Sequence, residues 1–300
     1  MNIEKKATLV SSTTALFLTL MKLFIGIFSN SVSIIASAID SLLDFFVSIF
    51  NYFAIKNSQK PADDNFNYGR GKIEAIACFI EGTIIIISGI FLFYTSIQKA
   101  INNEISLYID ISIIVMIISL IITILLVIYL NKIAIKTNNL IIKTDALHYK
   151  IDIYTSMIIL ISLILINLTN YYIIDSILAS CISIYIIYSS YPLVKKGILI
   201  LLDKSLDKKI VNHIKHIITN EKEVTTYHML KTRESSNQIF VDVHLVFHCL
   251  ISLLKAHKIS DKIEDKIRNI DKKRKWNITI HLDPYDDSKE DNIELKDKNI

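Results

Sequence analysis

Two pairs of metal-ligand side chains stand four residues apart in apolar segments: Asp40 with Asp44, and His148 with Asp152. On a helix this spacing puts both members of a pair on one face. Three carboxylates and one imidazole form a four-ligand set for a divalent metal ion, and the mixture of nitrogen and oxygen favours Zn²⁺, Fe²⁺, Co²⁺, Mn²⁺ or Cd²⁺ over Mg²⁺ or Ca²⁺. The pattern therefore predicts a metal site shared by two helices.

Asp40 and Asp44 lie near the middle of segment 31–53, which is long and apolar enough to cross a bilayer. A carboxylate at that depth costs about 2.5–3.5 kcal/mol, and two such charges repel unless a cation or a proton lies between them. Ligation needs a neutral imidazole and ionised carboxylates, so metal and protons compete for the same atoms. We therefore expect metal–proton exchange; the alternative is that one aspartate pairs with a lysine of a neighbouring helix.

The elements that must position these residues are helices that span a membrane. The 300-residue chain is 52% hydrophobic, its mean hydropathy is +0.43, and its net charge of +4 suits basic membrane flanks better than nucleic-acid binding. The basic residues of the links after the second and fourth spans predict cytoplasmic termini. Apolar runs predict six transmembrane helices: 7–28, 32–55, 74–99, 107–130, 145–168 and 172–192.

A change of composition near residue 201 predicts a second, water-soluble domain. Its periodicity gives a helix over 202–220, strands over 224–236 and 238–248, a helix over 253–270 and a strand over 276–284. This order, αββαβ, predicts an open sheet with two helices on one face. We expect a membrane domain over 1–200, a cytoplasmic domain over 201–288 and a disordered tail over 289–300.

The predicted soluble domain has its own candidate ligands on strands and on the helix that faces them. His281 and Asp283 are two residues apart on a strand and therefore share a face. Four imidazoles and one carboxylate can hold two metal ions with the carboxylate between them. These ligands are His228, His244, His257, His281 and Asp283. The chain has no P-loop, GxSxG or HExxH motif, so ATP-driven and hydrolytic functions are disfavoured and we expect no enzyme.

At these motifs the chain resembles the cation diffusion facilitators, in particular the bacterial zinc and ferrous-iron efflux proteins. The resemblance rests on DSLLD at 40–44, PADDNFNYGRGKIEA at 61–75, DALHYKID at 145–152, LLDKSL at 201–206, VDVH at 241–244 and IHLDP at 280–284. It implies an inner-membrane homodimer that exchanges cytoplasmic Zn²⁺, Fe²⁺ or Cd²⁺ for protons by alternating access. It also implies that the transmembrane set is the transport site and that a metallochaperone-like domain carries a binuclear site at the dimer contact.

The resemblance further implies an ion pair between Lys72 and Asp203 near the dimer axis. It also implies a loop metal site with one aspartate and two histidines, but here Phe66 and Arg70 stand at the histidine positions. Phenylalanine has no ligand atom and arginine stays protonated, so we expect no metal in this loop. We expect Asp63 to form a turn or a helix cap, or to pair with Arg70.

Two hypotheses compete with metal–proton antiport. The altered loop and Lys150, a cation two residues from both His148 and Asp152, leave open a metal-sensing membrane dimer without transport. The helical period predicts that Lys150 points away from the site. A cation channel, whose flux would not depend on a proton gradient, is the third hypothesis.

Overall fold

The computed structural model describes residues 2–28, 32–102, 110–169 and 173–287. The chain forms two compact units, Met1–Ile198 and Leu199–Ile300. The tail predicted to be disordered, 289–300, lies outside the described residues. Each unit is considered by itself below.

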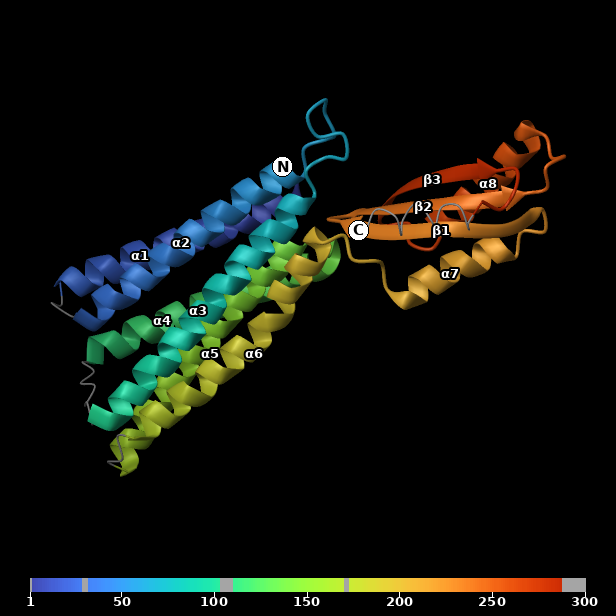
Figure 1. The fold of residues 1–300 in the computed structure, drawn as a ribbon. Coiled ribbons are helices and arrows are strands. Elements are labelled where there is room, and N and C mark those ends of the chain that lie inside the picture. The colour runs from blue at the N-terminus through green and yellow to red at the C-terminus, as the bar shows by residue number, and fades with distance from the viewer. Residues whose placement is uncertain (1, 29–31, 103–109, 170–172, 288–300) are drawn as a thin grey trace. The chain divides into compact units, whose positions relative to one another are not determined.

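The first unit consists of long helices, and the described residues form six of them (Figure 1). The predicted helices are confirmed, although the last ends at Leu201 rather than near residue 192. The helices are α1 (Ile3–Phe28), α2 (Val32–Ser58), α3 (Lys72–Asn102), α4 (Asp110–Thr137), α5 (Leu140–Thr169) and α6 (Ile173–Leu201).

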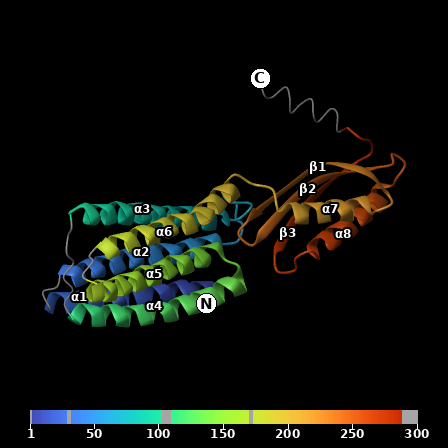
Figure 2. The same cartoon turned by 90° about the horizontal axis from the view of Figure 1, so that it is seen from below.

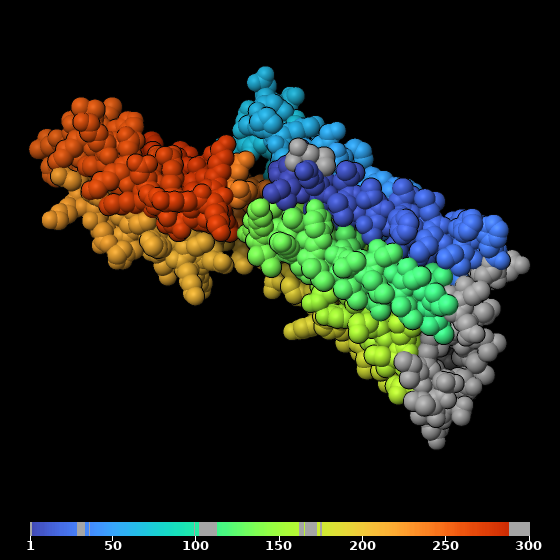
Figure 3. Space-filling view, turned by 180° about the vertical axis from the view of Figure 1, so that it is seen from behind, coloured from blue at the N-terminus to red at the C-terminus, as the bar shows by residue number. Residues whose placement is uncertain are grey.

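The outer surface of the helical unit is apolar. Figure 3 shows α1 and α4 side by side on one outer face, and both expose large hydrophobic side chains, among them Phe24 and Leu125. Among the described residues, five helices are long and apolar enough to cross a membrane: α1, α2, α3, α4 and α6. Helix α5 carries His148 and Asp152 and packs against α2, α3 and α4. These two residues therefore lie near other helices of the bundle.

The second unit has the predicted order αββαβ. Its elements are α7 (Lys208–Thr219), β1 (Val224–Ser235), β2 (Gln238–Phe247), α8 (Leu253–Arg268) and β3 (Lys275–Asp283). The sheet order is β1-β2-β3; β2 pairs antiparallel with β1 and parallel with β3. Helix α7 begins later than predicted, because Asp203 takes a φ of 53° and no regular element resumes before Asp207.

Within the described residues of this unit, helices cover one face of the sheet and no helix covers the other, which is called the open face below. Helices α7 and α8 lie side by side on the covered face (Figure 2). Val241, Val243 and Leu245 of β2 point into the core with Ile214 of α7 and Ile263 of α8. Because side chains alternate along a strand, the residues between them point to the open face. This alternation decides which histidines can meet.

Candidate metal sites

Three of the four predicted transmembrane ligands converge between α2 and α5. The Nε2 atom of His148 lies 2.9 Å from Oδ1 of Asp44 and 3.9 Å from Oδ2 of Asp152. One ligand atom from each of the three residues lies within 4.8 Å of the others. Metal–nitrogen and metal–oxygen bonds are about 2.0–2.2 Å long, so one ion can reach all three after small side-chain movements.

The contact between α2 and α5 is fixed close to this group. The hydroxyl groups of Ser48 and Tyr149 lie 2.9 Å apart and form a hydrogen bond between the two helices. Tyr149 is only 2% exposed, so its ring holds the neighbouring His148 in register with α2. The geometry of the ligands therefore depends on packing as well as on their i,i+4 spacing.

A cavity of about 520 Å³ adjoins the three ligands. Asp40, Asp44 and Asp152 line it, together with Lys22 of α1. Asp40 is the predicted ligand that lies outside the group of three. It faces the same cavity one helical turn from Asp44, so it stands where a metal ion or water in the cavity can contact it.

Lys22 is a residue of this site that the sequence reasoning did not single out. Its Nζ donates hydrogen bonds to Oγ of Ser41, at 2.8 Å, and to the backbone oxygen of Ser37, at 3.4 Å. A lone lysine inside the first apolar span was the available signal. Lys22 is therefore a candidate for the alternative in which a lysine from a neighbouring helix pairs with one of the aspartates.

Lys150, by contrast, is directed to another part of α5. Its ammonium lies 5.6 Å from the centre of the Tyr154 ring, a cation–π contact. This agrees with the expectation that Lys150 points away from the ligands. The two lysines therefore differ in surroundings: Lys22 lines the cavity, whereas Lys150, which is closer to the ligands in sequence, contacts Tyr154.

The cytoplasmic domain brings three histidines into one row. His228 of β1 is the register partner of His244 of β2, and His244 is the register partner of His281 of β3. The row lies on the open face, and Asp283, two residues beyond His281, lies on that face too. The ring centres of neighbouring histidines are 4.8 and 4.7 Å apart.

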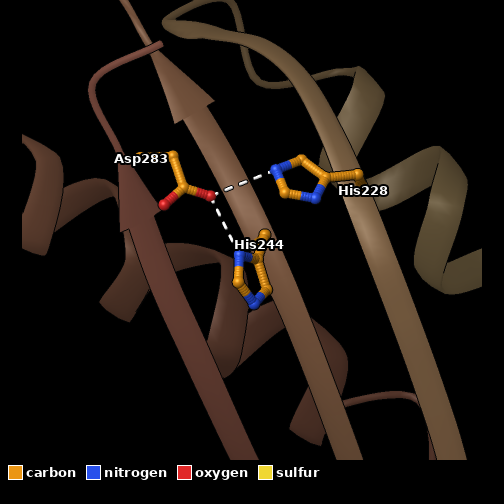
Figure 4. A group of neighbouring side chains, drawn as sticks. All are labelled: His228, His244 and Asp283. Atoms are coloured by element: carbon orange, nitrogen blue, oxygen red, sulfur yellow. Dashed lines mark hydrogen bonds and ion pairs between the residues drawn. The ribbon is translucent and has the colours of Figure 1, made fainter. Parts of the chain in front are cut away.

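Asp283 is the centre of this group. Its Oδ2 lies 3.2 Å from Nε2 of His228 and 3.0 Å from Nδ1 of His244 (Figure 4). Its Oδ1 lies 3.1 Å from Nε2 of His281. The side chain of Asp283 is 5% exposed whereas that of His281 is 66% exposed. A buried carboxylate with imidazoles on both oxygens suits a bridging ligand, and these residues fit one or two zinc-type ions.

The fifth predicted ligand, His257, is not brought to this group within one chain. It lies on α8, which covers the other face of the sheet, and its Nδ1 is 3.2 Å from Oδ1 of Asp261. Asp287 was not predicted; its Oδ1 lies 3.1 Å from Nε2 of His228. The position of Asp287 just after the turn at Pro284 was the only sequence signal for it.

A break in strand pairing lies beside His228. The register between β1 and β2 shifts between His228 and Lys231, and Met229 has a φ of 50°. A non-glycine residue in this left-handed region is uncommon, and bulges next to functional sites re-aim side chains. The irregularity keeps His228 opposite His244, in one register with Thr226 and Tyr227, whereas Lys231–Ser235 follow another register.

The loop between α2 and α3 has the predicted arrangement without a histidine ligand. Nη2 of Arg70 lies 2.6 Å from Oδ2 of Asp63, and the backbone nitrogens of Asn65 and Phe66 donate to its Oδ1. The guanidinium of Arg70 lies over the Phe66 ring, 4.3 Å from its centre. Asp63 both pairs with Arg70 and forms a turn, as predicted.

Lys72 and Asp203 belong to different units, so the ion pair expected between them stays a prediction. Within the second unit, Oδ1 of Asp203 lies 3.5 Å from Nη1 of Arg233.

A multi-span helical unit with candidate metal ligands between its helices, followed by an α+β domain with a second candidate group, defines a multi-pass membrane protein. The chain belongs to the cation efflux family: residues 8–202 match the cation efflux transmembrane domain, and residues 206–285 match the cytoplasmic domain of cation efflux proteins. This family consists of transporters.

Curated relatives agree over nearly the whole length. The chain is 34% identical over 282 residues to "Protein p34" of Rickettsia prowazekii, which covers 94% of this chain and 92% of that protein. It is 33% identical to "Cation-efflux pump FieF" of Escherichia fergusonii and 32% identical to the protein of that name in Escherichia coli K12; each alignment covers 93% of this chain and 92% of the relative.

Proposed function

We propose that this protein exports Zn²⁺ or Fe²⁺ from the cytoplasm in exchange for protons, and that Cd²⁺ fits the same ligands. The observation that carries the proposal is the convergence of Asp44, His148 and Asp152 between two helices of a membrane bundle. Nitrogen and oxygen ligands bind these ions, and protonation of the same atoms releases them. Asp40 completes the set when the cavity holds a metal ion.

The charges around the cavity support an exchange of one divalent ion for two protons. Asp40, Asp44 and Asp152 contribute three negative charges when ionised, and Lys22 contributes one positive charge. A divalent ion with neutral His148 therefore makes the cavity neutral. Two protons in place of the ion, one on His148 and one on a carboxylate, also make it neutral. Charge is costly at bilayer depth, so both loaded forms are suited to a rearrangement of the helices.

Lys22 has a defined role in this scheme. Its ammonium is held by Ser41 and Ser37, so it balances the third carboxylate without occupying a ligand position. It also lowers the attraction of the cavity for a cation, which favours release. The lysine thus contributes to turnover rather than to tight binding.

For the cytoplasmic domain we propose metal binding that stabilises a homodimer. His228, His244, His281 and Asp283 would hold the metal within one chain. Since His257 lies on the other face of its own sheet, a fifth ligand would come from His257 of the partner subunit. The metal would supply a cross-link between two chains, and the domain would thereby sense the cytoplasmic metal concentration.

We also propose that the protein lies in the plasma (inner) membrane with both termini in the cytoplasm. The support is the position of basic residues: Lys132 and Lys136 near the end of α4, and Lys56 near the end of α2, belong to the links on one side. The positive-inside rule assigns that side to the cytoplasm.

Flux in proteoliposomes tests the transport function. Purified full-length protein is reconstituted, a pH gradient is imposed, and Zn²⁺ or Fe²⁺ movement is followed with an indicator dye inside the vesicles. We expect gradient-driven flux in the wild type and none in Asp44→Asn. Metal binding without flux in the wild type would favour a sensor, and flux independent of the gradient would favour a channel; either result overturns the proposal.

A further inference from the structure

A second group of carboxylates is buried deeper in the helical bundle, apart from the proposed metal ligands. Glu81 of α3 and Asp145 of α5 are 1% and 0% exposed, and Asn51 of α2, also 0% exposed, lies between them. Nδ2 of Asn51 donates to Oε2 of Glu81 at 3.1 Å and to Oδ1 of Asp145 at 3.4 Å. Oγ of Ser11, from α1, donates to Oδ2 of Asp145 at 2.7 Å.

Hydrogen-bond donors are too few for this group when both carboxylates are ionised. In the described part of the chain, two hydrogens on Nδ2 of Asn51 and one on Oγ of Ser11 face five acceptor oxygens, four on the carboxylates and one on Asn51. Oε1 of Glu81 and Oδ1 of Asn51 are buried and have no hydrogen-bond partner among the described residues. Turning the amide of Asn51 around does not change this balance.

The charges near the pair do not keep both carboxylates ionised. Among the described ionisable side chains that act on the pair, Asp44 of α2, Cys78 of α3 and Tyr149 of α5 carry no positive charge, and His148 of α5 is positive only when it is itself protonated. Lys196 acts on Cys78. Two ionised carboxylates are strongly unfavourable in such a place, whereas a proton on one of them turns an acceptor into a donor.

We infer that Glu81 and Asp145 form a proton-binding site in which the two carboxyl groups hold one proton between them. The ligand class is the proton, because the orphan atoms are acceptors and because an added hydroxyl donor satisfies them without a further ion. The site needs no conformational change, since Asn51 already bridges the two side chains.

The position of the pair connects it with the proposed exchange. Asp145, His148 and Asp152 are spaced i, i+3 and i+7 on α5, so they share a face, and Asp145 is about 4.5 Å from His148 along the helix axis. If the antiport proposed above holds, this proton lies one helical turn from a metal ligand. This last step rests on the proposed function, whereas the shared proton does not.

Infrared spectroscopy of the purified full-length protein in an ester-free detergent tests the inference without any transport. A protonated carboxyl group has a carbonyl stretch that a carboxylate lacks, and the band shifts in heavy water. We expect the wild type to show this band and the isosteric variant Glu81→Gln to lose one carboxyl equivalent of it, because the new amide supplies the hydrogen-bond donor that the proton supplied. Asp145→Asn should lose the same band intensity. If Glu81→Gln does not fold, the band of Asp145→Asn alone tests the shared proton.

Glu221→Gln is the matched control, since Glu221 is a buried glutamate whose oxygens accept hydrogen bonds from Lys262 and Lys266. Its replacement should leave the band unchanged. Equal band intensity in the wild type, Glu81→Gln and Asp145→Asn would overturn the inference. A flux assay with Glu81→Gln separately tests the link to antiport, so failure of that link and failure of the shared proton give different results.

Discussion

Nε2 of His148 lies 2.9 Å from Oδ1 of Asp44, although 104 residues separate them in the chain. The contact joins α5 to α2, and Asp152 lies on the same face of α5 as His148. An imidazole between two carboxylates is held in a fixed orientation, which is the arrangement a metal ligand needs. The contact therefore brings candidate ligands from two helices together.

Asp44→Asn should abolish metal binding at this site while preserving the fold. The amide matches the carboxylate in size, but it carries no charge and is a poor ligand for Zn²⁺ or Fe²⁺. We expect the affinity for the metal ion to fall by more than about 100-fold, since loss of a residue that only hydrogen-bonds to a metal ligand already costs about 10–100-fold. Isothermal titration calorimetry of the detergent-purified protein measures this. Asp63→Asn, in the loop, is the control and should bind normally; equal affinity in all three proteins would argue against the site.

Most of the fold could be predicted because its signals are periodic. Six apolar runs gave the helices, and period-two patterns gave the strands, since burial on one face repeats along each element. The end of α6 and the start of α7 were harder to predict. They depend on the backbone of Asp203, whose positive φ is set by local packing and not by a residue type that demands it.

The candidate sites were partly predictable for a related reason. Residues on one helix face or one strand face follow from spacing, as with His148 and Asp152. Contacts between elements do not: Lys22, Asp287 and the partners of Glu81 depend on how helices and turns pack. The sequence also could not show that His257 and His244 lie on opposite faces of one sheet, because α8 could have covered either face.

Lys22→Met should increase the affinity of the cavity for Zn²⁺ and slow transport. Removal of a positive charge from a cavity with three carboxylates strengthens cation binding, by on the order of tenfold or ~1.4 kcal/mol, and hinders release. Lys22→Arg keeps the charge and should restore most of the turnover. Calorimetry and proteoliposome flux report the two effects.

Lys150→Met is the matched control for Lys22→Met, because the Lys150 ammonium lies over Tyr154. It should change neither affinity nor flux by more than about twofold. If both substitutions raised the affinity equally, the effect would be one of general charge, and the role assigned to Lys22 would be wrong.

The double substitution Phe66→His with Arg70→His should create a metal site in the loop. Asp63 Oδ2 now contacts Arg70, and Phe66 lies between them in sequence and packs on the guanidinium. Two imidazoles in place of the ring and the cation would give Asp63 two nitrogen co-ligands. Metal analysis by mass spectrometry should find one additional Zn²⁺ per chain. The triple variant that also carries Asp63→Asn should lose it again; an unchanged metal content in the double variant would contradict the prediction.

The stabilisation that Glu221 gives the cytoplasmic domain should be lost at acidic pH. The hydrogen bond from Lys262, with another from Lys266, outweighs burial and holds the pKa of the Glu221 carboxyl below its usual value of 4.5. A depressed pKa stabilises the fold above the unfolded-state pKa, and this stabilisation disappears as the pH falls through the lower, folded-state value. Glu221→Gln should therefore cost about 1–3 kcal/mol at pH 7 and much less near pH 3.

Urea unfolding of the full-length protein, followed by the fluorescence of Trp276 in the cytoplasmic domain, measures this difference. Glu223→Gln serves as the control, because Glu223 pairs with Lys255 at the surface and both side chains are about half exposed. Its effect should be near zero at both pH values. An equal loss for Glu221→Gln at pH 7 and pH 3 would show that the lysines contribute packing and not charge.

His257→Ala and His244→Ala should separate metal binding within one chain from metal-dependent dimerisation. His244 contacts Asp283 at 3.0 Å, so its loss should remove metal from each cytoplasmic domain. His257 lies on α8 and is 68% exposed, so its loss should leave the one-chain group intact but weaken the zinc-dependent association of two chains. Metal content and analytical ultracentrifugation with and without Zn²⁺ report the two properties. His213→Ala, an exposed histidine of α7, is the control. If His257→Ala dimerised with Zn²⁺ as the wild type does, the proposal that His257 of the partner subunit is a ligand would be wrong. His257 cannot be a ligand within its own chain, because α8 lies on the opposite face of the sheet.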